Sequence, residues 1–252
     1  LHVRGEIVVK SSGEALKKGD KLDSEAQIAF KSKDAVAALF SSEKGRFTLS
    51  PAEKGEAFGE EFIAYVKSSV LPSRKGLSAR AGKVLLNEMD IRKYFGKDRM
   101  VILQPWRVTV SEEAYTQTNE GFFYMRYYHD PQTADVNKKI SWEGDEMLID
   151  FDDILMLGRE KTDPKDNSDY QLFYFKPANK HSKLFCYVHP IFPDIESLKD
   201  EVKTLLELET ARRGEALSRE ETIGEVDAYL QEYYGWPDPT MLNAWMDAHF
   251  PE

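Results

Sequence analysis

The sequence predicts a β-rich α+β protein with a small N-terminal β barrel or sandwich, a second, seven-strand β barrel with a capping helix, and C-terminal helices. Three observations lead to this prediction. Short apolar runs separated by turn residues recur about every ten residues in the first fifty, which is typical of a small barrel or sandwich. A second set of strand-like runs lies between residues 100 and 190. Amphipathic helical patterns follow that second set up to the C-terminus.

Composition excludes several classes of protein. The 252 residues suffice for one or two domains with their own cores, and 12% aromatic residues exclude a collagen, coiled-coil or disordered chain. No apolar run reaches the roughly 18 residues that a membrane-spanning helix needs. The single cysteine, Cys186, excludes an internal disulfide and a multi-cysteine zinc site. The chain begins at Leu1 rather than Met, so we expect that an upstream segment was removed.

The charge is unevenly distributed around a net value of −10. Residues 67–107 contain ten lysines and arginines against three acidic residues, whereas residues 194–252 contain fifteen acidic residues against five basic ones. The acidic C-terminal segment is therefore an electrostatic complement of the basic stretch, in the same chain or in a second copy. The acidic remainder would repel phosphate, which disfavours nucleic-acid binding by the basic stretch.

The first strands are expected within residues 3–50. Val3, Ile7 and Val9 alternate as in a strand, and Gly19-Asp20 predicts a turn between two apolar anchors. Further strands are expected at residues 27–30, 35–40 and 46–49.

The runs GEIVVKSSGEALKKGDKL, AQIAFKSKDAVAALFS and GRFTLSP together resemble the FecR-like β-repeat of bacterial envelope proteins. The residues that carry the resemblance are Leu16, Gly19, Asp20, Leu22, Ile28, Ala37 and Phe47. The resemblance covers about the first fifth of the chain, and any SH3-like barrel is the alternative. It implies a non-catalytic interaction module in the cell envelope or periplasm; without it, a cytoplasmic location is expected.

A helix and a basic connecting segment are expected between the two β modules. One apolar face at helical spacing predicts a helix within residues 56–70. Residues 73–82 are small, polar and basic, as in an exposed loop, and residues 90–95 favour a turn of helix. We therefore expect four segments: a β domain at 1–66, a basic connection at 67–103, a barrel at 104–208 and helices at 209–252.

Residues 100–190 contain about seven strand-like runs. The run Phe122–Tyr128 is strongly aromatic, and Glu143-Gly144-Asp145 reads as a hairpin turn. Asp194 then caps a helix whose apolar residues recur at helical spacing, namely Leu198, Val202 and Leu205.

The segment ISWEGDEMLIDFDDILMLGRE, followed by YQLFYFK, KLFCYVHP and ESLKDEVKTLL, resembles bacterial pleckstrin-homology-like (PH-like) domains over residues 104–208. The resemblance implies binding of a peptide, partner or lipid rather than catalysis. Phosphoinositide sites of that family use basic residues in the first hairpin. The hairpin near residues 116–121 has none, so lipid binding is not expected.

Two further helices are expected at the C-terminus. Ser218 and Glu221 form a capping box, Gly235 is a C-cap, and Asp238-Pro239 begins the last helix. Such short helices must bury their apolar stripes in this chain or in a partner, and both alternatives remain open. The residues that we assign to partner binding are Trp236, Leu242, Trp245 and Met246, together with the basic Arg74, Lys75 and Arg80.

The sequence contains no strong catalytic signature. Asp150 and Asp152 would share one face of a strand and, with Asp153, could hold a divalent metal, but solvated turn residues explain them better. Cys186 lies in a strand and is expected to be a structural thiol. We predict a non-catalytic binding or assembly component that needs no cofactor and engages a protein partner or a second copy. The alternatives are a metal-dependent hydrolase or nuclease at the Asp cluster, and a nucleic-acid binder at residues 67–107.

Overall fold

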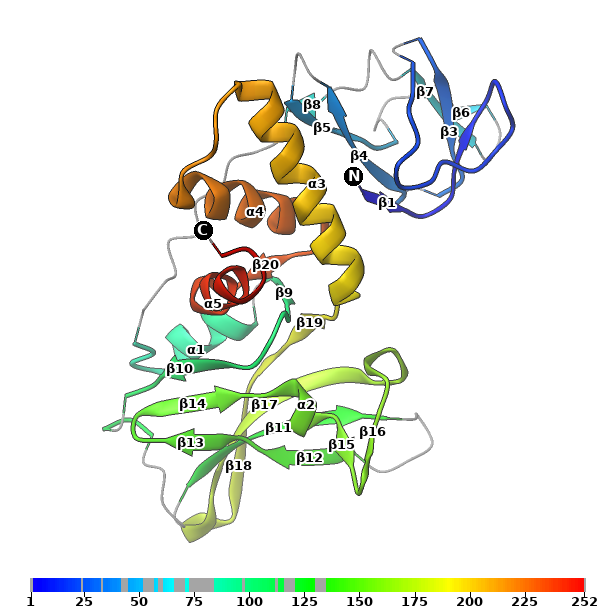
Figure 1. Cartoon of the computed structure of the whole chain (residues 1–252). Coiled ribbons are helices and arrows are strands. Elements are labelled where there is room, and N and C mark those ends of the chain that lie inside the picture. Colours follow the sequence, from blue (N-terminus) through cyan, green and yellow to red (C-terminus); the bar gives the residue numbers. More distant parts are fainter. Residues whose placement is uncertain are drawn as a thin grey trace. The chain divides into compact units, whose positions relative to one another are not determined.

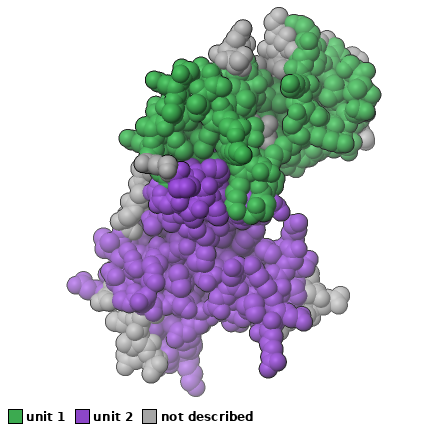
Figure 2. Space-filling view, viewed as in Figure 1, with its two compact units in different colours: residues 1–76, 196–228 green, residues 77–195, 229–252 purple. Residues whose placement is uncertain are grey.

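The protein has the β-rich α+β fold that the sequence predicts, with five α-helices and several small sheets among the described residues (Figure 1). The chain forms two compact units in this computed structural model: unit 1 comprises residues 1–76 and 196–228, and unit 2 comprises residues 77–195 and 229–252 (Figure 2). The structure describes residues 2–23, 25–32, 34–41, 45–51, 57–58, 61–65, 71–72, 84–96, 98–111, 113–115, 121–129 and 135–251.

The described strands of unit 1 form two antiparallel four-stranded sheets. One sheet has the order β1-β4-β5-β8 and the other the order β2-β3-β7-β6. The first sheet consists of β1 (His2–Arg4), β4 (Val36–Ser41), β5 (Gly45–Leu49) and β8 (Leu71–Pro72). The second consists of β2 (Ile7–Val9), β3 (Gln27–Phe30), β7 (Glu61–Tyr65) and β6 (Ala57–Phe58). No described strand pairing closes these sheets into a barrel.

The core of this β module contains the apolar anchors that the sequence singled out. Leu16, Ile28, Ala37 and Phe47 are buried in one cluster. The turn predicted before Leu22 is present, because the Asp20 carboxylate accepts a hydrogen bond from the backbone N–H of Lys17 at 2.8 Å and Gly19 takes a φ of +92°. The predicted turn is therefore present, and the apolar residues of the N-terminal pattern lie in one core.

The helix predicted within residues 56–70 is wrong. The described parts of this range are strands β6 and β7, and β7 pairs along its length with β3. Aromatic and β-branched residues in this range suit a strand as well as a helix, so the neighbouring strand decided the outcome. The spacing of apolar residues alone does not show that β3 has a free edge with which a further strand can pair.

Unit 1 is completed by residues from the C-terminal part of the chain. Helix α3 (Ile195–Arg213) and the first part of α4 (Arg219–Tyr233) belong to it. The apolar stripe of α3, Leu198, Val202 and Leu205, is fully buried. The capping box of α4 is present, since Glu221 accepts from the backbone N–H of Ser218 at 2.9 Å and Ser218 Oγ accepts from the N–H of Glu221 at 3.3 Å.

Unit 2 contains two antiparallel sheets, with the orders β10-β14-β13 and β12-β11-β17-β18. The first consists of β10 (Trp106–Thr109), β14 (Glu146–Ile149) and β13 (Ser141–Glu143). The second consists of β12 (Val136–Lys139), β11 (Phe122–Tyr128), β17 (Ser168–Lys176) and β18 (His181–Tyr187). The predicted hairpin turn joins β13 to β14, with Gly144 at a φ of +64°. The described pairings do not close the two sheets into a barrel.

A small sheet, three α-helices, a hairpin and two 3-10 turns complete the description of unit 2. The sheet has the order β19-β9-β20, and both pairings are parallel. It consists of β19 (His189–Ile191), β9 (Arg99–Val101) and β20 (Trp236–Pro237). The remaining elements are α1 (Glu88–Phe95), α2 (Phe151–Ile154), the hairpin β15 (Met156–Leu157) with β16 (Glu160–Lys161), the 3-10 turns η1 (Pro164–Asp166) and η2 (Pro177–Asn179), and α5 (Pro239–His249).

Gly235 connects the end of α4 to β20. Its N–H donates to the Leu230 carbonyl at 2.8 Å, as a residue after a helix C-terminus does. Its φ is +148°, and a Cβ atom here would lie 2.4 Å from the Arg99 carbonyl oxygen of β9. Only glycine allows the chain to approach β9 this closely.

The grouping into units differs from the domain boundaries expected from the sequence. Residues 194–208 were expected to cap the barrel at 104–208, but from Glu196 onward α3 belongs to unit 1. Residues 229–252 return to unit 2 instead of forming a separate helical segment. Within the expected connection at residues 67–103, residues 67–70, 73–83 and 97 lie outside the described residues.

Candidate functional site

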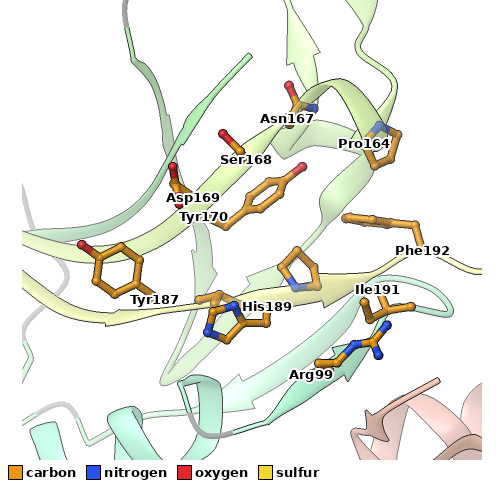
Figure 3. Close-up of a pocket in the computed structure, with 12 residues that line it drawn as sticks. Arg99, Pro164, Asn167, Ser168, Asp169, Tyr170, Tyr187, His189, Ile191 and Phe192 are labelled. Carbon is orange, nitrogen blue, oxygen red and sulfur yellow. The ribbon is translucent and has the colours of Figure 1, made fainter. Parts of the chain in front are cut away.

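Unit 2 contains a pocket of about 400 Å³ between the beginning of β17 and strand β19 (Figure 3). We call it the β19 pocket. Ser168, Asp169 and Tyr170 line one side of it, while His189, together with Arg99 from β9, lines the other. A volume in this range is typical of sites that bind small molecules or single side chains.

Three of the residues that line the β19 pocket carry tyrosine or phenylalanine rings. Tyr170 packs within a group of rings, with its centroid 5.4 Å from that of Tyr127 and 5.9 Å from that of Phe151. Phe192 lies edge-on to Phe151, at 5.1 Å between centroids, and Tyr187 lines the pocket with half of its surface exposed. These rings fix the wall and offer an apolar surface to a ligand.

The charged groups of the β19 pocket have no partner among the described residues. Neither the Arg99 guanidinium, the Asp169 carboxylate nor the His189 imidazole makes a side-chain hydrogen bond or ion pair with a described group. Asp169 also has a φ of +54°, which is uncommon for a residue other than glycine. A cation, an anion and a titratable ring are therefore available to a ligand in one pocket.

The Tyr170 hydroxyl is buried, and no described group bonds to it with normal hydrogen-bond geometry. The nearby Asn167 amide is already engaged: its Oδ1 lies 2.9 Å from His129 Nδ1, and its Nδ2 donates to Thr162 at 3.0 Å. Burial raises the pKa of Tyr170 to about 12, although Asn167 opposes the rise. Tyr170 thus stays a neutral phenol that can still donate one hydrogen bond.

The partner-binding role assigned to the C-terminal apolar residues does not agree with their position. Trp236, Leu242, Trp245 and Met246 are all buried in the folded chain, and the most exposed, Trp236, shows 7% of its surface. Helix α5 packs near β10, and Leu103 of the same unit donates its backbone N–H to the Met241 sulfur at 3.4 Å. The four residues are core, which was the other alternative that the sequence left open. The basic residues Arg74, Lys75 and Arg80 lie outside the described residues.

Asp238 links helix α5 to α1 and β10 through a buried chain of hydrogen bonds. Its carboxylate caps α5 by accepting from the N–H of Met241 at 2.9 Å, and it also accepts from the Tyr94 hydroxyl. Tyr94 in turn accepts from Trp106 Nε1 at 3.1 Å. The predicted Asp-Pro start of the last helix is confirmed, and the same residue joins α5 to α1 and β10.

The arrangement predicted for the aspartate cluster is wrong. Asp150 follows the end of β14 and caps α2 by accepting from the N–H groups of Asp152 and Asp153. Asp152 is exposed and pairs with Lys161. Asp150 and Asp152 therefore do not share a strand face, and no group of three His, Cys, Asp or Glu residues in the described part of the chain could hold a metal ion. Helix capping explains Asp150, because its carboxylate accepts hydrogen bonds from backbone N–H groups two and three residues later.

Cys186 has the surroundings of a structural thiol. It lies in β18, partly exposed, and burial raises its pKa to about 12. At neutral pH it is therefore a thiol rather than the thiolate that a nucleophile requires.

Two described basic residues of the 67–107 stretch, Arg92 and Arg107, have acidic partners within unit 2. Arg107 Nη2 lies 2.7 Å from Glu143 Oε2, and Arg92 Nη2 lies 2.7 Å from Glu88 Oε1. These pairs differ from the predicted complement, the acidic segment 194–252. The hairpin near residues 116–121, on which the expectation about lipids rests, lies outside the described residues except for residue 121.

Sequence reasoning missed the residues that line the β19 pocket. In the sequence, Arg99 is one member of the basic stretch at residues 67–107, and no motif singles out His189. The pocket exists because β19 pairs with β9, about ninety residues earlier in the chain, and no local pattern encodes that pairing. The one available signal was the cluster of His189, Pro190 and Phe192 directly after a strand.

Comparisons with known proteins give no relative for this chain. No protein-family model, curated protein or solved structure matches it. Across the residues that the structure describes, every helix is too short or too polar to cross a membrane. The site and the fold therefore carry the functional argument alone.

Proposed function

We propose that the protein is a non-catalytic binding or assembly component that engages a protein partner, and that a segment of this partner docks in the β19 pocket. The observation that carries the proposal is the presence of three exposed polar side chains without a described partner, Arg99, Asp169 and His189, beside the rings of Tyr170 and Phe192. Because these side chains make no described contact that stabilises the fold, they can exchange water for the polar groups of a ligand.

The chemistry of the pocket defines the segment that it would bind. Arg99 can take a carboxylate in a two-point contact, and His189 lies opposite it in the strand pairing of β19 with β9. The rings of Tyr170 and Phe192 favour a bulky apolar side chain, and Asp169 can accept a backbone N–H. We expect a peptide with an acidic residue close to an aromatic or large aliphatic one.

Side-chain recognition is favoured over strand addition at this site. β19 is an edge strand of its sheet, which would normally allow a peptide strand to pair with it. Pro190, at its centre, has no N–H to donate, and proline at an edge is a common obstacle to such pairing. Affinity would then come mainly from the pocket.

The resemblances to PH-like and FecR-like domains are consistent with a binding role. The two antiparallel sheets of unit 2 together contain seven strands between Trp106 and Tyr187, which supports the strand part of the PH-like domain proposed for residues 104–208. The Lys17–Asp20 turn and the shared core of Leu16, Ile28 and Phe47 support a FecR-like β module, and with it a bacterial cell-envelope location. Neither proposal includes a catalytic residue or a cofactor.

Peptide display on the purified full chain tests the proposed function. We expect selection to enrich peptides that combine an acidic residue with a bulky apolar one. The double variant Arg99→Gln/His189→Gln should weaken their binding about tenfold or more, because it removes a charge-assisted contact. The matched control is Arg159→Gln, which neutralises an exposed arginine of unit 2 outside the pocket.

The outcomes separate the alternatives. Peptides that bind the double variant as tightly as the wild type, or the absence of any enriched pattern, would contradict docking in this pocket. An enriched pattern that matches a segment of this chain would identify the partner as a second copy.

A further inference from the structure

We propose that unit 2 carries a second site, which binds a small ligand with an aromatic ring and an anionic group. The site is a pocket of about 360 Å³ where the turn between β17 and β18 lies beside Glu88 of α1. We call it the lysine pocket. It is independent of the β19 pocket, because the two share no lining residue.

The inner surface of the lysine pocket is aromatic and buried. It is formed by Tyr115, Tyr174 and Phe185, none of which exposes more than 9% of its surface. The Tyr115 ring lies edge-on to the other two, with centroids 5.4 Å from Tyr174 and 5.6 Å from Phe185. Because these rings hold one another in place and expose little of their surface, they form a rigid apolar floor that a small planar ligand would contact along one edge.

Cations lie over this aromatic surface. Lys176 Nζ is 5.8 Å from the centroid of the Tyr174 ring, and Lys183 Nζ is 5.9 Å from that of Phe185. His181 also lines the pocket. Lys176 and the His181 imidazole have no carboxylate partner among the described residues, so their hydrogen-bonding capacity is open to an anion.

One carboxylate, Glu88, also faces the lysine pocket, and it is neutralised from two sides. It pairs with Lys183, and its Oε1 lies 2.7 Å from Arg92 Nη2. The hydrogen bond from Lys183 is the largest of the contacts that lower the pKa of Glu88, with Arg92 adding to it. Glu88 therefore fixes Lys183 in position, while Lys176 remains the uncompensated charge.

The two parts of the pocket together specify the ligand. The exposed Lys176 ammonium offers a contact to an anion, and the ring floor offers an apolar contact to the edge of a ring. A carboxylate and a phosphate can both satisfy a lysine, since its ammonium acts as a point charge with three donors. The shared chemistry is thus an aromatic anion.

NMR titration of the isotope-labelled full chain tests this inference with four probes: phenyl phosphate, benzoate, inorganic phosphate and benzyl alcohol. We expect saturable binding of phenyl phosphate or benzoate at least about tenfold tighter than that of the ring-free and the uncharged probes. The stronger of the two aromatic anions identifies the anionic group. Shifted signals should include amides of Lys176, His181 and Lys183.

Two variants separate the lysine pocket from general attraction of anions. Lys176→Gln should weaken binding of the aromatic anion roughly three- to tenfold. Lys203→Gln, which removes an exposed lysine of α3, and Arg99→Gln/His189→Gln, which alters the β19 pocket, should leave it unchanged. Equal binding of inorganic and phenyl phosphate, undiminished binding by Lys176→Gln, or no saturable binding would each overturn the inference.

Discussion

Unit 1 and unit 2 attach their helices and sheets by different interactions. In unit 1, charged groups connect α3 to the β module: Lys18 Nζ lies 3.6 Å from Oε1 of the buried Glu201 and donates to the Ser197 carbonyl at 3.0 Å. His2 Nδ1 of β1 lies 3.5 Å from the other Glu201 oxygen. Arg213 then joins α3 to α4 through Glu221 at 2.7 Å and Glu225 at 3.0 Å.

Unit 2 depends instead on packed rings. Phe123 is fully buried, with centroids 4.8 Å from Tyr174 and 5.6 Å from Phe185. It also stacks nearly parallel to Trp142, at 6.1 Å and 5° between the planes. Tyr174 and Phe185 also line the lysine pocket, whereas the β19 pocket is lined by Tyr170 and Phe192 from a second group of packed rings.

Ion pairs in unit 1 account for three acidic residues of the C-terminal segment. Glu201, Glu209 and Glu225 are buried, and each lies within ion-pair distance of a basic residue of unit 1. Buried carboxylates need such partners, so the charge of these three residues stabilises the fold of unit 1. Binding is consequently expected in unit 2, where charged groups remain unpaired.

The largest effect is expected from opening the aromatic core of unit 2. Phe123→Ala should lower the free energy of unfolding by ~3–5 kcal/mol, because it removes a fully buried ring and leaves a cavity. Chemical denaturation, with hydrogen exchange reading the strands of unit 2, measures the loss. The loss should be nearly the same in about 0.05 M and about 1 M NaCl, since salt does not screen apolar packing. A cost below about 1 kcal/mol would contradict the role given to the ring cluster.

A smaller effect is expected from removing one buried charge of unit 1. Glu201→Gln should cost ~1–2 kcal/mol, less than a fully buried pair, because Lys18 is partly exposed and can turn to water. The cost should shrink in high salt, unlike that of Phe123→Ala. Glu207→Gln, at an exposed position of the same helix, is the matched control and should change stability by less than about 0.5 kcal/mol. Equal costs at positions 201 and 207 would show that the buried contacts of α3 do not depend on charge.

The smallest effect concerns the capping box of α4. The backbone N–H and hydroxyl of Ser218, followed by Arg213, hold the pKa of Glu221 below its usual value of 4.5. Because the folded pKa is the lower one, the ionised carboxylate stabilises the helix start above pH 4.5, and this contribution is lost as the pH falls through the folded pKa. Hydrogen exchange of the first amides of α4, compared at about pH 6 and about pH 3, should show this loss in the wild type and in Glu220→Gln. The loss should be absent in Glu221→Gln, and an unchanged pH dependence in that variant would assign the effect to other groups.

The sequence determined the elements that depend on neighbouring residues. The turn at Gly19-Asp20, the capping box at Ser218 and the cap at Asp238 were all predicted, and all are present. Each is made by hydrogen bonds between groups no more than three residues apart, so its information lies within one short segment. The strand Gln27–Phe30 and the aromatic strand Phe122–Tyr128 were predictable for a similar reason, since strand propensity and alternation are local.

The tertiary structure alone decided the rest. Residues 57–58 and 61–65 form strands because β3 offers an edge for pairing, and Trp245 lies in the core because residues 229–252 return to unit 2. Both pockets unite groups that pairings across the chain bring together, such as Arg99 with His189 and Glu88 with Lys183. These contacts join residues about ninety positions apart, and their stability depends on which surfaces remain uncovered after packing. Local sequence patterns do not show which distant strands and side chains will pair, because strand propensity and charge are compatible with more than one pairing.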